Sequence, residues 1–356
     1  MTRILALIVV VAQFTVLIFM AGQREWVART GRTIFLRTAP VDPNDPVRGE
    51  YVRLNYEISQ VPRACCNDGV TSWLGHGTYD ASIRDRRVYA KVKLDSDGLA
   101  ELVSLCDAPP GAGTYLRGRI DWPNWNPDSL RVRYGIEALF VEEGKAQSLK
   151  ATRRAEMAGV PLDMEVAVNA DGLAVLKGYH WEPLGLLLTV ERPPAPPRSA
   201  NASQRQGQPQ PALRPPGLTG ATLELKNHSD RPVAVLTNSF RLIANPQRSP
   251  GHYRWVGAES APRKPTAEDV KVLQPGELYR AHVDFSSAEW LVIDPHSQKG
   301  GAPAVALGSL TNAWDASFRF EYAPPSAEDC SGLPDANLIW HRALPSRAFG
   351  PAGRVD

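Results

Sequence analysis

The sequence predicts a mainly β protein: two β-rich modules that follow one apolar helix at the amino terminus. Three observations predict this fold class. Short runs of alternating apolar and polar residues recur through most of the chain, and Gly, Pro, Asn and Asp clusters separate them. Proline, at 31 of 356 residues, exceeds its usual share of ~5%. The third observation is an apolar run at residues 4–21.

The apolar run at 4–21 is predicted to be a transmembrane anchor. Only Gln13 and Thr15 interrupt it, and its length is close to the lower limit of ~17–25 residues for a spanning helix. A buried core helix would carry a polar stripe, which this run lacks. A cleaved signal peptide would need small residues before its cleavage site, where Phe19 and Met20 stand. The sequence therefore favours an uncleaved anchor, of the kind that usually exports the chain after it.

The stretch from Asp42 to Ile58 combines a turn and a strand. Its two Asp-Pro steps, at Asp42 and Asp45, favour a turn because proline fixes φ and aspartate caps local N–H groups. From Tyr51 the residues alternate with a period of two, which predicts a half-buried strand. The face expected to be buried carries Val52, Leu54, Tyr56 and Ile58.

Two motifs in this half of the chain carry a family resemblance. Gly49-Glu50-Tyr51-Val52-Arg53-Leu54-Asn55-Tyr56 resembles the signature of the GDYxxLxY domain family, with Glu50 where the family has Asp. A second likeness follows at Tyr134-Gly135-Ile136-Glu137, and the resemblance covers about residues 30–180. It implies a membrane-anchored bacterial protein with an integral-membrane protein partner. Together with the signal-like layout of the anchor, this predicts a protein of the bacterial inner membrane with an extracytoplasmic body. The resemblance brings no known reaction.

The first module is expected at 30–191 as a small barrel or sandwich with one surface helix. Turn residues at 95–98 and 169–172 predict two hairpins. A Lys- and Arg-rich segment at 145–157 predicts the helix. The predicted strands are 33–37, 88–94, 99–105, 115–120, 130–134, 164–168 and 173–176.

Beyond the first module we expect a linker, a second module and a flexible tail. Residues 192–217 are rich in proline and poor in large apolar side chains, so burial there cannot offset the entropy of ordering. Residues 218–344 show spaced short strands without a helical pattern, which predicts an immunoglobulin-like β-sandwich. Residues 345–356 form the tail. The strands expected in the second module are 223–225, 233–236, 240–243, 278–285, 290–293 and 318–322.

The composition and the motif search predict neither a cofactor nor a metal nor a nucleic-acid partner. A formal charge of +2 gives little attraction to nucleic acid. The sequence has no nucleotide-binding glycine loop, no nucleophile elbow, no His pair at helical spacing and no CxxC pair.

Four cysteines allow several interpretations. In an exported body, Cys65 or Cys66 could pair with Cys106, which would leave Cys330 and one vicinal thiol over. The alternative is reduced, buried thiols. No Cys–His spacing supports a catalytic thiol.

Two small groups of side chains are candidate ligand contacts. Asp42, Asp45 and Glu50 could perform acid–base chemistry or hold a hard cation, although Asp-Pro turns use carboxylates as caps in the same way. Trp122 and Trp125 could offer an aromatic face to a glycan, although tryptophan is more often buried.

We therefore expect a non-catalytic binding or assembly module for a membrane partner. The alternatives are an envelope hydrolase that uses the acidic turn cluster and a glycan-binding module that uses the two tryptophans.

Overall fold

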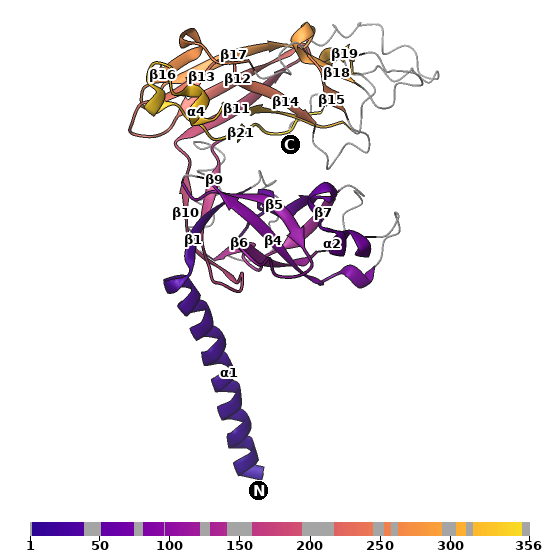
Figure 1. Cartoon of the computed structure of the whole chain (residues 1–356), viewed down its shortest axis with the longest axis vertical. Coiled ribbons are helices and arrows are strands. Elements are labelled where there is room, and N and C mark those ends of the chain that lie inside the picture. The colour runs from indigo at the N-terminus through magenta and orange to yellow at the C-terminus, as the bar shows by residue number, and fades with distance from the viewer. Residues whose placement is uncertain are drawn as a thin grey trace, which may run out of the picture. The chain divides into compact units, whose positions relative to one another are not determined.

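The computed structural model describes residues 2–38, 51–74, 81–95, 97–121, 129–140, 159–193, 217–244, 253–257, 263–293, 304–310 and 316–350. The chain divides into two compact units, which are described separately. The first unit comprises Met1–Thr152 and Pro161–Trp181, and the second comprises Arg153–Val160 and Glu182–Asp356. Both are built mainly from short strands (Figure 1), so the predicted fold class is confirmed at this level.

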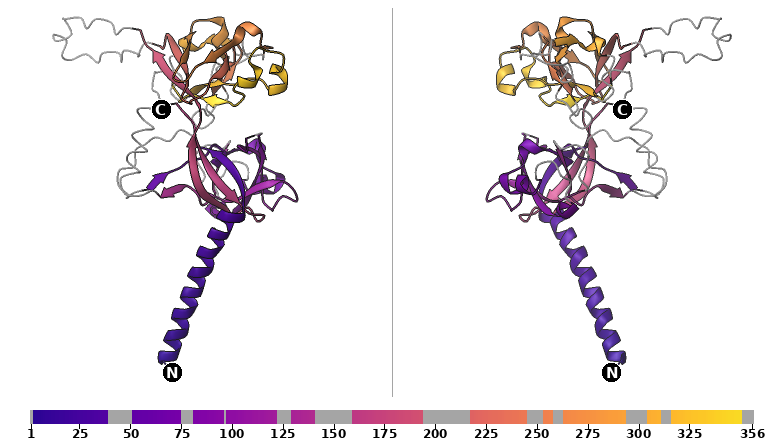
Figure 2. Two further views of the ribbon diagram at one scale, coloured as in Figure 1. Left: turned by 90° about the vertical axis from the view of Figure 1, so that its left-hand side faces the viewer. Right: turned by 90° about the vertical axis from the view of Figure 1, so that its right-hand side faces the viewer.

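The first unit begins with helix α1, Thr2–Thr30, which runs into strand β1, Arg32–Arg37, through Gly31 alone. The Gly31 N–H donates to the Val27 carbonyl at 2.8 Å, and the Val27 side chain is fully buried. A Cβ on Gly31 would lie 2.6 Å from the Val27 carbonyl oxygen, so glycine is needed for this close approach. Figure 2 shows that the rest of α1 projects away from the strands of its unit.

Helices are otherwise short in the described ranges. No helix in these ranges, α1 included, combines the length and the mean apolarity of a membrane span. Helix α2, Asp68–Trp73, is not among the predicted elements. Its amino end is capped by Asn67, whose side chain accepts from the Val70 N–H at 3.0 Å. The expectation of no helix in the second module is also wrong, because α4 spans Ala327–Cys330. The surface helix predicted at 145–157 lies outside the described residues.

Three groups of strands form the first unit. Strand β9 lies between β1 and β10, both antiparallel to it. A five-stranded sheet has the order β3-β7-β6-β4-β5, and β2 pairs with β8. The bounds are β2 Tyr51–Arg53, β3 Gln60–Pro62, β4 Arg87–Leu94, β5 Ala100–Cys106, β6 Thr114–Ile120, β7 Ser129–Arg133, β8 Ala138–Phe140, β9 Leu162–Val168 and β10 Ala174–Trp181.

The predicted hairpins of the first unit are confirmed. Strands β4 and β5 pair around a turn that closes at Gly98, and β9 and β10 pair around one that closes at Gly172. Both glycines have positive φ, +85° and +73°, a conformation that side chains with a Cβ disfavour. The core between the sheets is aliphatic, with Ile34, Leu36, Val88, Leu105, Leu116, Ile120 and Val166 fully buried.

The described residues of the second unit form four small sheets, in the orders β11-β12-β17, β13-β16, β14-β20-β21 and β15-β18-β19. Their core includes three stacked phenylalanines: Phe349 lies 5.7 Å from Phe285 and 5.5 Å from Phe320, measured between ring centroids. The bounds are β11 Leu184–Glu191, β12 Gly220–Asn227, β13 Val233–Leu236, β14 Phe240–Ala244, β15 Arg254–Trp255, β16 Val270–Leu273, β17 Leu278–Asp284, β18 Leu291–Ile293, β19 Ala304–Ala306, β20 Phe318–Tyr322 and β21 Leu344–Pro345.

Two boundaries differ from the prediction. Strand β11 was expected in the first module, but it pairs with β12 along its whole length, so the first unit ends at Trp181. The flexible tail predicted at 345–356 is wrong for residues 345–350. Phe349 is fully buried, and its backbone exchanges two hydrogen bonds with Phe318, at 2.7 and 2.8 Å.

Candidate functional site

The two motifs that carried the family resemblance lie against each other in the first unit. Strand β2 pairs with β8, with Tyr51 opposite Phe140. Directly after β2, the Leu54 N–H donates to the Glu137 carbonyl at 2.8 Å. The first motif and the second are about 80 residues apart, so these bonds join distant parts of the chain. We call Leu54, Tyr56, Ile58 and Tyr134–Glu137 the motif interface.

Two tyrosines cross this interface in opposite directions. The Tyr56 hydroxyl donates to the Ile136 carbonyl at 2.6 Å, and the Tyr134 hydroxyl donates to the Ile58 carbonyl at 2.8 Å. Both side chains are buried. Burial raises the pKa of both hydroxyls far above the usual value, and the nearby Glu137 carboxylate adds to the rise. Both tyrosines therefore remain protonated hydrogen-bond donors at physiological pH.

Glu137 holds the backbone of the second motif in a turn. Its carboxylate accepts hydrogen bonds from the Tyr134 N–H and from the Gly135 N–H, the latter at 2.9 Å. Gly135 has a φ of +81°, which explains why glycine occupies this position. These hydrogen bonds are internal to the domain, which gives the described signature residues a structural role in joining two segments.

The sequence predicted which face of the stretch at 51–58 is buried, but it did not predict the hydrogen bonds made by the tyrosine on that face. Leu54, Tyr56 and Ile58 are 1%, 0% and 6% exposed, which confirms the buried face predicted from the alternation. The strand itself is shorter than expected, because a 3₁₀ turn occupies Glu57–Ser59. No sequence pattern pointed to the crossed tyrosine hydroxyls.

Several predicted site residues lie outside the described residues. These are the acidic turn cluster and the start of the signature, at Asp42, Asp45, Gly49 and Glu50, together with Trp122 and Trp125.

The structure brings three of the four cysteines into one region of the first unit. Cys66 forms a parallel β-bridge with Leu105, the neighbour of Cys106, and the Asn67 N–H donates to the Leu105 carbonyl at 2.9 Å. Cys65, Cys66 and Cys106 are half-buried free thiols, and Cys330 is a buried free thiol of the second unit. A disulfide from Cys65 or Cys66 to Cys106 stays a prediction.

We expect Cys66 to be alkylated slowly. Burial raises the pKa of its thiol to about 11, the adjacent Cys65 adds to the rise, and Arg63 opposes it. Because the thiolate is the reactive form, its population at pH 8 is roughly 200-fold below that of an ordinary cysteine with a pKa of about 8.5. Timed iodoacetamide labelling of reduced full-length protein, followed by peptide mass spectrometry, measures this rate. A Cys66 rate equal to that of a denatured control would contradict the expectation.

A buried ion pair joins β1 to β9, and the sequence analysis did not find it. The Arg37 guanidinium donates to both carboxylate oxygens of Asp163, at 3.2 and 3.4 Å. The two side chains are 6% and 0% exposed. No local signal distinguishes this pair in the sequence, because β1 also carries Arg32 and β9 also carries Glu165.

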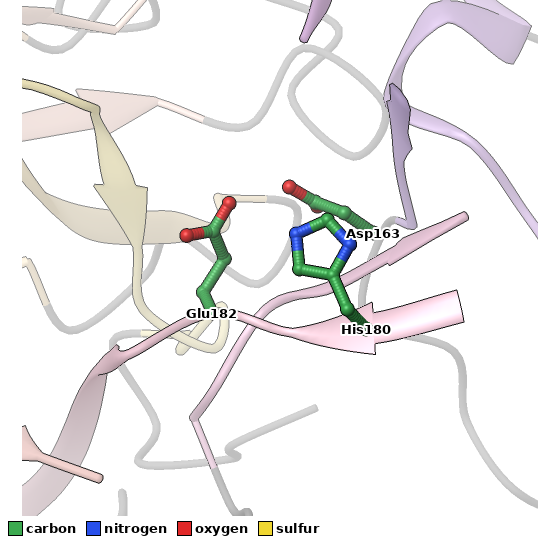
Figure 3. A group of neighbouring side chains, drawn as sticks. All are labelled: Asp163, His180 and Glu182. Atoms are coloured by element: carbon green, nitrogen blue, oxygen red, sulfur yellow. The ribbon is translucent and has the colours of Figure 1, made fainter. Parts of the chain in front are cut away.

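Asp163 also stands opposite His180 in the β9–β10 register. Figure 3 shows these two side chains with Glu182, the residue at which the second unit begins. Carboxylates and imidazoles are ligands of divalent cations. Each carboxylate already has an arginine partner within its own unit, however: Arg37 for Asp163 and Arg342 for Glu182. This pairing offsets the negative charge that would attract a cation, so the group carries no metal assignment.

The fold and the motif interface together define the class of the first unit: a β-rich domain in which hydrogen bonds join two sequence motifs that are distant along the chain. A family profile described as "GDYXXLXY protein" matches residues 13–178. This part of the chain therefore is a GDYXXLXY domain, and the resemblance inferred from the sequence is confirmed. No curated protein and no solved structure matched the chain.

Proposed function

We propose that the protein is a single-pass, membrane-anchored envelope protein of the bacterial inner membrane. Its β-rich body lies outside the cytoplasm and acts as a non-catalytic binding or assembly module for a membrane-protein partner. The finer description of the second unit as an immunoglobulin-like sandwich belongs to this proposal.

The exposed apolar surface of α1 carries the proposal. Its described large apolar side chains, at residue 4 and from residue 9 to residue 20, are 45–70% exposed, whereas Val27, near its carboxyl end, is fully buried against the strands. Water-exposed apolar area costs roughly 25 cal/mol per Å², and such continuous patches mark interaction or membrane surfaces. A bilayer would cover this part of α1 while leaving its junction with β1 unchanged.

The non-catalytic part of the proposal is supported by the motif interface. The described signature residues use their hydroxyl, carboxylate and backbone groups to bond one another, and the two tyrosines are buried. A signature built in this way maintains the shape of the domain, and a module of fixed shape suits recognition of another protein.

A fractionation experiment tests the anchor. Full-length protein is compared with a variant that lacks residues 2–23 and retains Val27. We expect the full chain to float with membranes and to resist alkaline carbonate extraction, and the shortened chain to remain soluble. Circular dichroism of the shortened chain shows whether it is folded. Release of the full chain by carbonate would contradict the anchor.

Two further measurements address the orientation and the partner. A reporter that is active only outside the cytoplasm, fused after Asp356, should be active, and an inactive but intact fusion would contradict the exported body.

Cross-linking with the anchor in place should recover an integral-membrane protein. Recovery of none would count against the binding module.

A further inference from the structure

The exposed face of the five-stranded sheet carries three arginines in line. Arg87 of β4 stands opposite Arg119 of β6, and Arg119 stands opposite Arg133 of β7. We call these three residues the arginine row; all three are exposed. Like charges directly opposite one another on neighbouring strands destabilise a sheet. Repulsion within the arginine row therefore lowers the stability of the sheet, and negative charge beside the row would offset this repulsion.

The chain supplies part of that negative charge from a strained position. Asp85 has a φ of +60°, a left-handed conformation that a residue with a Cβ rarely adopts. Its carboxylate accepts from Arg133 Nη2 at 2.7 Å, and its carbonyl accepts from Arg119 Nη1 at 2.8 Å. Asp121 adds a second carboxylate, 3.1 Å from Arg133 Nε.

The carboxylates of Asp85 and Asp121 neutralise only one end of the arginine row, at Arg133. Both carboxylates contact Arg133, while the one partner of the Arg119 guanidinium among the described residues is the neutral carbonyl of Asp85, to which it donates. In the part of the chain that the structure describes, the Arg87 guanidinium has neither an ion pair nor a hydrogen bond. The positive charge that no described carboxylate neutralises is therefore concentrated at Arg87 and Arg119.

We infer that the arginine row binds an acidic segment of a partner protein. Arginine matches carboxylates well, and Asp85 and Asp121 already show carboxylates bound on this face at 2.7 and 3.1 Å. Neighbouring strands are ~4.8 Å apart, so the row repeats at about 5 and 10 Å. Acidic side chains on successive turns of a helix repeat at ~5.4 Å. An acidic helix with carboxylates one turn apart fits this row.

The location of the row favours a protein over lipid headgroups, an argument that rests on the proposed function. Arg32, just after α1, donates to Thr114 at the start of β6 at 3.1 Å. Arg119 comes five residues later on that strand, roughly 16 Å away at ~3.3 Å per residue. This exceeds the ~8 Å Debye length at physiological ionic strength. In the anchored state this separation from the end of α1 weakens the attraction of the row by headgroups.

A direct binding measurement tests the inference on the full chain in nonionic detergent micelles. The probe is a labelled helical peptide with glutamates one turn apart, and fluorescence anisotropy gives its Kd at low salt. The double variant Arg87→Gln/Arg119→Gln should bind about tenfold more weakly, at roughly threefold per exposed pair. Arg254→Gln, which removes one charge from an exposed arginine of the second unit, should leave Kd unchanged.

Asp85→Asn provides the opposite change. Asparagine tolerates the left-handed conformation, and its neutral amide removes one of the two internal carboxylates from Arg133, leaving Asp121. We expect the peptide to bind this variant about threefold more tightly. Weaker binding to Asp85→Asn, or equal binding of the wild type and the double variant, would overturn the inference.

Two further controls separate the alternatives. Row-dependent binding of polyphosphate, or of phosphatidylglycerol vesicles, that is tighter than peptide binding would also overturn the protein-partner inference. Thermal unfolding should be unchanged or improved in the double variant, which shows that lost binding is not lost folding. The assay needs no membrane, so its failure and a failure of the anchor test are distinguishable.

Discussion

Replacement of Asp163 by alanine is expected to lower the free energy of unfolding of the first unit by ~3–5 kcal/mol. The substitution leaves the Arg37 guanidinium buried, at 6% exposure, without the carboxylate that it bonds at 3.2 and 3.4 Å. Removal of a carboxylate from beside a buried charge is costly because little water can replace it. Hydrogen exchange of full-length protein in micelles, followed on β1 and β9 peptides, measures the loss.

Two matched variants show whether burial is the cause. Glu165→Ala removes a carboxylate from the same strand, but its partner Lys177 is 34% exposed, so a loss below ~1 kcal/mol is expected. Arg37→Met/Asp163→Leu removes both charges and should recover most of the stability. An Asp163→Ala loss no larger than that of Glu165→Ala would show that the pair contributes little to the fold.

Truncation of Tyr56 to alanine is expected to destabilise the first unit by a similar amount, ~3–5 kcal/mol. The ring is fully buried in the core, so its removal leaves a cavity as well as a lost hydrogen bond to Ile136. Tyr56→Phe keeps the ring and removes only the hydroxyl, which leaves the Ile136 carbonyl without that donor. Its expected cost is about 1–3 kcal/mol.

The tyrosine series also tests the structural interpretation of the family signature. Hydrogen exchange of peptides from both motifs should rise together in Tyr56→Ala, because the interface joins them. Tyr179, which is 44% exposed on β10, supplies the control, and Tyr179→Ala should change neither motif. Exchange that rises only in the first motif would contradict a shared interface.

Local signals in the sequence predicted much of the fold. The turns ending in Gly98 and Gly172 gave both hairpins, because positive φ at glycine is a local requirement. The ordering of Phe349 and the pairing of β11 with β12 were not predictable in the same way. Both depend on contacts with distant residues, and the proline-rich segment after residue 191 suggested a boundary after β11 instead of before it.

In the candidate site, too, local features were predictable from the sequence and long-range contacts were not. Alternation predicted that Tyr56 faces the core, since a period of two fixes which side chains share a face. The partners of its hydroxyl and of Arg37 depend on the order and register of strands that are 80 and 126 residues away along the chain. The arginine row needed the β4-β6-β7 register, because nothing in the linear sequence aligns residues 87, 119 and 133.

The junction at Gly31 has a mechanical consequence in the proposed anchored state. A domain on a flexible tether reorients independently of its anchor, but here the α1 terminus is bonded to Gly31 and packed through Val27. Spanning helices tilt by ~20° on average, and that tilt would be passed to β1 and the strands paired with it. The tilt of α1 would thereby fix the orientation of the first unit relative to the bilayer, and a membrane partner would encounter the unit in that orientation.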